Sequence, residues 1–267
     1  MKSLLMILRE QWNSLYLIKR LSIYELKSTN NSHYLGMLWE ILNPLTQMSV
    51  YWFVFGLGIR GGKGVDGVPF VYWLSVGLAV WFFISPATLQ ASKSIYTRLN
   101  LISKMNFPLS AIPSYVIISI FYQHLALIAI VTVGFLVAGP GLSIYYIQLP
   151  YYMFATVMFV FALSLITATL ATIVRDVQMI VQSSMRMLMY LTPILWTPEK
   201  LTPVLQDLIK LNPLCYVVDG YRAAFLKTGW FYQYPYAALY FWSIVLIMLL
   251  IGSILHVKLR KHFVDYL

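Results

Sequence analysis

Long runs of apolar residues constrain this chain more than any other feature of its sequence. Of its 267 residues, 60% are hydrophobic and only 10% are charged, whereas soluble domains carry about 25% charged residues. A helix needs roughly 20 mostly apolar residues to cross a bilayer, and the backbone amides of such a segment must be bonded within it. The sequence therefore predicts an all-α integral membrane protein.

Six of these runs are long enough to cross a membrane. Their expected limits are 36–58, 68–92, 110–137, 150–174, 178–197 and 235–257. An even number of spans places both termini on one side. About twice as many Lys and Arg residues fall on that side as on the other, so the positive-inside rule predicts a multi-pass protein with both termini in the cytoplasm.

The first 28 residues carry charges too often to form a span. On a helix of about 100° per residue, Lys2, Arg9, Arg20 and Lys27 fall along one line, and most of the apolar residues lie opposite. This pattern predicts an amphipathic helix in the membrane interface, with its cations towards headgroups and water. The alternative is a cytoplasmic helix that packs on protein.

Residues 199–230 are too polar to span and too regularly apolar to form a loose loop. Leucines and isoleucines recur at helical spacing until Asn212-Pro213 interrupts the pattern, and Tyr216 begins a second helical pattern. We expect two short re-entrant helices that dip into the outer leaflet before the last span.

Motifs for nucleotide, metal and acid–base chemistry are weak in this sequence. The stretch GLGIRGGKG (56–64) resembles a phosphate-binding loop, but Leu57 and Gly64 stand where that loop needs Gly and Ser or Thr. Acidic residues form no pair within a span, and the histidines form no cluster for a metal. The basic residues are spread over short loops, which argues against a nucleic acid partner. We expect neither a catalytic site nor a cofactor.

Two polar residues fall well inside predicted spans. Arg186 is either a snorkelling or paired structural arginine, or a cation that lines a path for an anionic substrate. His124 lies beside Gln123, and this pair is either functional or bonds one helix to another. We favour the bonding interpretation for His124.

Five stretches occur in an order that is similar to a known family. They are YLGMLWEILNPL (34–45), LISKMNFPLSAIP (101–113), TIVRDVQMIV (172–181), LTPILW (191–196) and LNPLCYVVDGYRAAF (211–225). Together they resemble the permease subunits of ABC exporters for teichoic acids, O-antigens and capsular polysaccharides, over nearly the whole chain. Among these the wall teichoic acid translocation permeases look most similar.

This resemblance implies a half-transporter that forms a homodimer and binds two copies of a separate cytoplasmic ATPase, which holds the Mg-ATP. It implies a gate helix over 1–32, a type 2 ABC transmembrane domain over 33–260 and a cytoplasmic tail over 261–267. The cargo would be a glycopolymer linked to a polyprenyl pyrophosphate, with wall teichoic acid as the first candidate. The chain would also contact membrane lipid.

The resemblance also nominates site residues. It implies a coupling helix at 95–107 between the second and third spans, and a second ATPase contact at the turn around 174–177. The coupling candidates are Arg98, Asn100, Lys104, Asn106, Phe107, Pro108, Arg175 and Asp176. The candidates for the translocation path, on spans one and five, are Trp39, Tyr51, Trp52, Phe55, Met185, Met189, Tyr190 and Trp196. Cations suited to an anionic pyrophosphate at the entrance are Arg9, Lys19, Arg20 and Lys27.

Two other classes of protein fit parts of the sequence. A polytopic enzyme acting on polyprenyl-linked sugars would need paired acids or histidines at the interface and a sizeable donor-binding loop, and neither is evident. An ABC permease for a drug or a small lipid would share most of the pattern, although the aromatic content of 16% favours a glycopolymer.

Overall fold

Four long helices form the frame of the molecule: α4 (Phe70–Ile102), α5 (Ala111–Ala138), α6 (Leu149–Ile173) and α10 (Pro235–Leu259). The computed structural model describes residues 2–30, 34–102, 107–139, 141 and 143–266. Within these ranges, the four helices and their short extensions are the ones long and apolar enough to cross a bilayer. The chain is therefore a helical multi-pass membrane protein, as its apolar runs predict.

The other two predicted spans are helical but less regular. Residues 36–59 form a 3-10 turn, the α-helix α3 (Trp39–Tyr51) and a π-helical turn (Trp52–Ile59), with Pro44 inside α3. Residues 176–191 form α7 (Asp176–Leu191), which has 16 residues. Neither element is a long uninterrupted α-helix: the first changes to π-helical geometry at Trp52, and the second ends where Thr192 becomes extended before Pro193.

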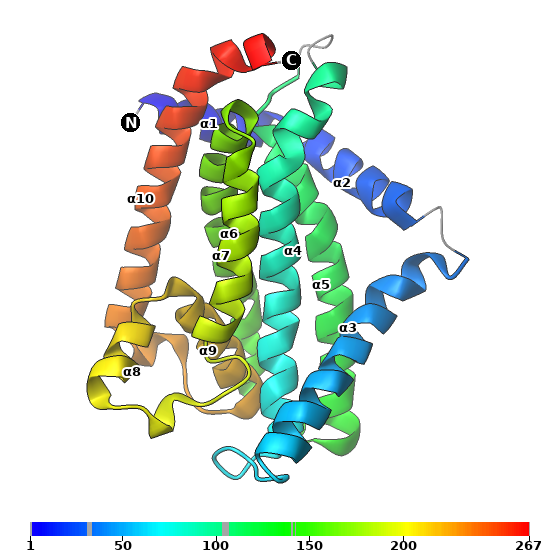
Figure 1. Cartoon of the computed structure of the whole chain (residues 1–267), viewed down its shortest axis with the longest axis vertical. Coiled ribbons are helices and arrows are strands. Elements are labelled where there is room, and N and C mark those ends of the chain that lie inside the picture. The colour runs from blue at the N-terminus through cyan, green and yellow to red at the C-terminus, as the bar shows by residue number, and fades with distance from the viewer. Residues whose placement is uncertain (1, 31–33, 103–106, 140, 142, 267) are drawn as a thin grey trace.

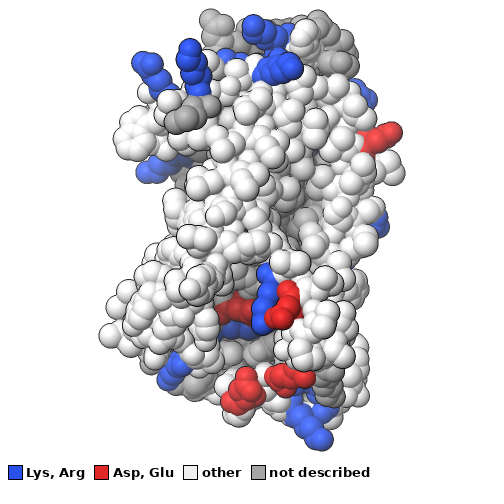
Figure 2. Space-filling model, turned by 90° about the vertical axis from the view of Figure 1, so that its left-hand side faces the viewer, with Lys and Arg blue, Asp and Glu red and all other residues white. Residues whose placement is uncertain are grey.

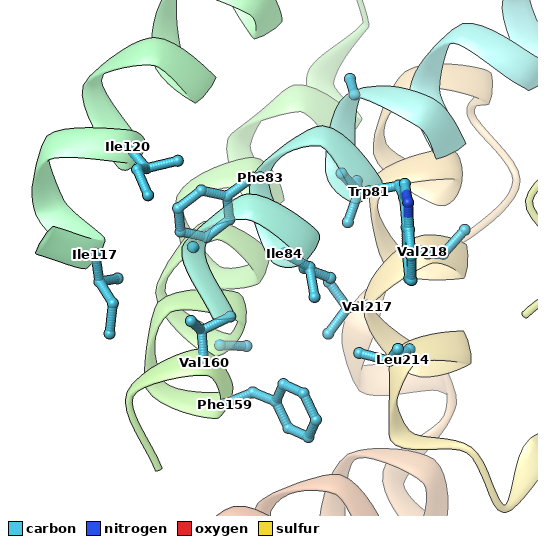
Figure 3. Packing of buried hydrophobic residues seen from close by; sticks show 14 of the residues in the cluster. Trp81, Phe83, Ile84, Ile117, Ile120, Phe159, Val160, Leu214, Val217 and Val218 are labelled. Carbon is cyan, nitrogen blue, oxygen red and sulfur yellow. The ribbon is translucent and has the colours of Figure 1, made fainter. Parts of the chain in front are cut away.

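The helix α4 lies at the centre, packed against α3, α5, α6, α7 and α9. Figure 3 shows how Phe83 and Ile84 of α4 meet apolar side chains from three neighbouring helices. The neighbouring residues labelled there are Ile117 and Ile120 of α5, Phe159 and Val160 of α6, and Leu214, Val217 and Val218 of α9. This core is continuous from α5 to α9, so the short helix α9 belongs to the bundle and is not a surface loop.

Both termini lie at the same end of the bundle (Figure 1). The helices α1 (Lys2–Asn13) and α2 (Leu15–Asn30) run across this end, where α1 packs on α10 and α2 on α5. Figure 2 shows Lys and Arg gathering at this end, followed by a broad band with few charges. Such a band is what the hydrocarbon core of a bilayer requires.

The N-terminal segment is two helices where the sequence predicts one. The interruption at Ser14 is slight, since the Ser14 amide still donates to the Glu10 carbonyl and the Ile18 amide donates to the Ser14 carbonyl. Ile7, Ser14, Ile18 and Ser22 are buried on one side. The two helices therefore pack one side against the bundle and expose their cations on the other side.

The helix α4 also extends further than the predicted span. It runs without interruption to Ile102, because no glycine or proline lies between Pro86 and Pro108. Residues 95–102 are its last two turns and not part of a separate coupling helix. Residues 103–106, the centre of the predicted coupling helix, lie outside the described residues.

At the opposite end, two short helices lie where the sequence predicts a re-entrant pair: α8 (Pro203–Lys210) and α9 (Pro213–Leu226). Both begin with a proline, whose missing amide costs nothing in a first turn. The Asn212 side chain caps α9 by accepting a hydrogen bond from the Leu214 amide. The predicted interruption at Asn212-Pro213 is therefore confirmed.

One close approach between α9 and α6 gives a stability prediction. A Cβ at Gly220 would lie 2.0 Å from the Tyr152 ring, whereas a Cβ at Gly134 in α5 would meet nothing within 4 Å. We expect Gly220→Ala to lower the thermal midpoint of the detergent-solubilised protein, at a cost of about 1–3 kcal/mol from overpacking. Gly134→Ala is the matched control and should unfold no earlier than the unchanged chain, because alanine favours a helix interior more than glycine does. Equal midpoints for the two variants would contradict this packing.

Candidate functional site

A cavity of about 370 Å³ opens between α3, α4 and α5, with one residue each from α2 and α7. Aromatic and polar side chains share its wall. The aromatic ones are Trp39, Tyr51, Trp81 and Phe82, and the polar ones are Glu40, Asn43, Gln47, Ser85, Gln90, Ser119, Gln123 and His124. Amides and hydroxyls can hydrogen-bond to sugar hydroxyls in either direction, and aromatic rings offer flat apolar faces. No Lys or Arg is among the described residues of this wall.

Three of the eight predicted path residues meet at this cavity. Trp39 and Tyr51 reach it from α3, and Met189 reaches it from α7. The Tyr51 hydroxyl donates to the Met189 sulfur at 3.7 Å, so it connects the two helices that the family resemblance places along the path.

The other path candidates are dispersed. Trp52 lines a second cavity of about 280 Å³ between α3, α4 and α5, and Phe55 packs near Tyr51, with ring centroids 6.3 Å apart. Met185 is buried in the core and Tyr190 is exposed. The Trp196 indole donates to the Tyr190 carbonyl at 2.8 Å. These five side chains do not form one surface with the first three.

The exposed faces of α7 and α10 differ in chemistry. The exposed side of α10 carries Leu239, Leu246, Ile247, Ile251 and Ile254, which suits contact with lipid chains. The exposed residues of α7 are mixed. Gln182, Ser183, Ser184 and Arg186 are polar, whereas Met179, Ile180, Met187, Tyr190 and Leu191 are apolar or aromatic. Polar and charged groups are costly against lipid and usually face protein or water, so the polar group around Arg186 is the part of α7 that we expect to face something other than lipid.

The N-terminal helices are fixed to α4 by an ion pair. The Arg98 guanidinium, near the end of α4, contacts the Glu25 carboxylate of α2 and lies 5.6 Å from the centre of the Tyr115 ring. Both charged side chains are about a quarter exposed (24% and 25%). Arg98 is therefore engaged within the chain, and its contact with another subunit stays a prediction.

A second acidic residue fixes the same helices on the far side of the predicted coupling segment, at Ser110. The Glu10 carboxylate accepts a hydrogen bond from the Ser110 hydroxyl at 2.6 Å and binds Arg260 at 2.6 Å. Its neighbour Gln11 donates to the Ser110 carbonyl at 2.9 Å and accepts from the Ser114 hydroxyl. Contacts from α1 and α2 thus bracket the segment between Arg98 and Ser110. Charge could have indicated this, because Glu10 and Glu25 are the acids among many cations in residues 1–28.

The remaining coupling candidates fall into three groups. The side chains of Asn100, Lys104 and Asn106 lie outside the described residues. Phe107 and Pro108 are half-buried, and Phe107 packs against the core. Arg175 and Asp176 are exposed in the turn between α6 and α7, at the end that holds the termini. The entrance cations Arg9, Lys19, Arg20 and Lys27 are all exposed on α1 and α2.

A buried arginine connects α9 to the segment after α7, at the end of the bundle opposite the termini. Arg222 of α9 is 6% exposed and donates to the carbonyls of Pro193 and Ile194 at 2.7 and 3.2 Å. Its guanidinium lies 3.4 Å from the centre of the Trp73 ring. Sequence reasoning did not single out Arg222, because no local pattern reveals a partner 28 or 29 residues away.

Two further contacts hold the segment that follows α7. The Arg60 guanidinium donates to the Thr197 hydroxyl at 2.6 Å, and the Asn212 amide donates to the Thr192 hydroxyl at 2.9 Å. Residues 192–197 are therefore held from the end of the first predicted span, from the junction of α8 and α9, and from α9 itself. We call residues 192–197 the post-α7 segment.

His124 takes the structural role that the sequence favours. It is buried, and its Nε2 lies 3.0 Å from the Tyr221 hydroxyl of α9. Its ring stacks on Phe83 at 5.0 Å. His124 thus bonds α5 to α9 and packs against α4, and both it and the neighbouring Gln123 line the cavity. Among the described residues, no group of His, Cys, Asp and Glu could hold a metal ion.

Long apolar helices with a polar cavity among them mark this chain as a membrane protein with room for a ligand. Comparison with known proteins gives the family. The chain belongs to the ABC-2 type transporter family, whose sequence model matches residues 16–226.

Individual relatives cover most of the chain. A protein named as an O-antigen export system permease from Klebsiella pneumoniae is 27% identical over 266 residues, which is 98% of this chain and 100% of the relative. A protein of the same description from Myxococcus xanthus is 26% identical over 227 residues, 83% of this chain and 84% of the relative.

Proposed function

We propose that this chain is the membrane-spanning subunit of an ATP-driven exporter of a polyprenyl-pyrophosphate-linked glycopolymer. It would cross the bacterial plasma membrane six times, with both termini in the cytoplasm, and work as a homodimer with two copies of a separate ATPase. The Mg-ATP would belong to that ATPase. The relatives' description as O-antigen export permeases supports the polysaccharide cargo.

The observation that carries the proposal is the pairing of a sugar-compatible cavity with a polar exposed helix face. The cavity offers aromatic rings and amides at the depth of the bilayer. Beside it, α7 exposes Gln182, Ser183, Ser184 and Arg186. A monomer would present this polar surface to lipid, at a cost of several kcal/mol. A homodimer that encloses a hydrated path between two such faces would avoid that cost.

The polymer is the finer part of the proposal. The family resemblance in the sequence predicts wall teichoic acid, whereas the relatives above are named for O-antigen export. Export assays with each polymer, carried out with the same purified complex, would decide between a phosphate-rich and a sugar-only cargo.

Deletion of the gene in its native host tests the function. We expect surface polymer to disappear while lipid-linked polymer accumulates on the cytoplasmic side. Continued display of the polymer would contradict the proposal. If synthesis of the polymer itself stopped, the rival enzyme class would be favoured instead.

Coupling to the ATPase has its own test. Replacing Lys104 with Glu and Phe107 with Ala together should reduce export by tenfold or more while the chain still inserts into the membrane. The control is Lys63→Glu, a charge change in the glycine-rich stretch 56–64, at the other end of the bundle. If the double variant still binds its ATPase and exports normally, the coupling segment has been assigned wrongly.

A further inference from the structure

Arg186 stands apart from the other arginines that lie within or beside the bundle. Arg98 and Arg260 bind carboxylates, Arg222 binds carbonyls and a tryptophan ring, and Arg60 binds Thr197. The Arg186 guanidinium makes one polar contact in the described structure, at 3.3 Å from the Ser183 hydroxyl of its own helix. No described carboxylate lies within ion-pair distance of it.

Its depth makes this isolation costly. Arg186 comes ten residues after the start of α7 at Asp176, which is about 15 Å at 1.5 Å per residue. That distance is about half the thickness of a hydrocarbon core of roughly 30 Å. An exposed arginine at this depth is stable only beside water, a partner group or a ligand.

The neighbours of Arg186 indicate which side of α7 it lies on. Residues three and four positions apart share one side of a helix, so Gln182, Arg186 and Met189 lie along the same side of α7. Met189 lines the cavity described above, and Ser183 already contacts the guanidinium. The arginine therefore stands one turn from the cavity, towards the end that holds both termini.

The chemistry of the group defines its ligand. A guanidinium offers a planar fork of donors that matches the oxygens of a phosphate, and the cavity wall itself has no described cation. We propose that Arg186, with Ser183 and Gln182, is an anion subsite of the path that binds a phosphate ester of the cargo. This inference rests on the proposed function, because it assigns a phosphate-bearing cargo to the same path.

A binding measurement on the chain in lipid nanodiscs tests the subsite. The probes are a long-chain prenyl diphosphate and a short glycerol phosphate oligomer, with the prenyl alcohol as the measure of nonspecific uptake. Arg186→Gln should weaken binding of at least one phosphate probe by about tenfold or more, as expected for lost hydrogen bonds to a charged group. Arg186→Lys should retain part of the affinity, because it keeps the charge without the fork.

Met187→Gln is the matched control, since Met187 is the next residue and is also exposed. A loss confined to the prenyl diphosphate identifies the lipid anchor as the source of the phosphate, and a loss confined to the oligomer identifies the polymer repeats. If Arg186→Gln binds both probes as tightly as Met187→Gln does, or if the unchanged chain binds neither, the subsite is refuted. Export by the unchanged complex is scored separately, so failure of the subsite and failure of the proposed function remain distinguishable.

Discussion

Reversing the charge of Arg98 should reduce ATP-driven export by about tenfold or more, and Glu25→Arg should do the same. Either change places two like charges in a partly buried contact between α2 and the end of α4, which costs free energy on the scale of a broken buried pair, about 1–3 kcal/mol at this exposure. The double variant Arg98→Glu with Glu25→Arg restores opposite charges and should recover much of the export. Export by membrane vesicles containing the assembled complex is the measurement.

Lys93→Glu is the control for this pair. Lys93 is exposed on the same helix, a little over one turn before Arg98, and undergoes the same charge change. It should leave export close to that of the unchanged complex. If the double reversal were as defective as either single reversal, the contact between α2 and α4 would not be the cause, and Arg98 would act by meeting another subunit, as the sequence first predicted.

Removal of the Arg222 side chain should have the largest effect on stability. Arg222→Ala leaves the Pro193 and Ile194 carbonyls without their donor and opens a void beside Trp73. A buried acceptor that loses its donor costs about 1–3 kcal/mol, and two carbonyls and the packing on Trp73 are affected together. We expect a markedly lower thermal midpoint in detergent, and little rescue by Arg222→Lys, because lysine cannot form the same fork or stack on the ring.

Lys210→Ala separates this effect from a general loss of positive charge. Lys210 pairs with Asp207 on the exposed surface of α8, where ion pairs contribute little. Its variant should unfold at the same temperature as the unchanged chain. Equal midpoints for Arg222→Ala and Lys210→Ala would contradict the proposed role of Arg222 in holding the post-α7 segment.

Helices and membrane class could be predicted because they depend on local pattern. The apolar runs predict α5, α6 and α10 within a few residues and the start of α4, although α4 continues ten residues past its predicted end, and Asn212-Pro213 predicts the boundary between α8 and α9. The sequence shows only whether a segment is long and apolar enough to span a bilayer. Because α3 contains a proline and α7 is short, the count of six spans stays a prediction.

Contacts between distant parts of the chain could not be predicted in the same way. Arg98 and Glu25 are 73 residues apart, and Glu10 and Arg260 are 250 apart. Each of these side chains reads as a surface charge in its own segment. Only the fold brings them together, so the sequence alone does not reveal these two ion pairs.

Reconstitution of the purified chain with its ATPase in proteoliposomes tests the central claim most directly. Lipid-linked glycopolymer is placed on the side of the vesicle that carries the ATPase, and its appearance on the other side is followed after addition of Mg-ATP. We predict transfer only when both subunits and hydrolysable ATP are present, and no ATP hydrolysis by this chain alone. Transfer by the chain without the ATPase, or hydrolysis by the isolated chain, would contradict the account.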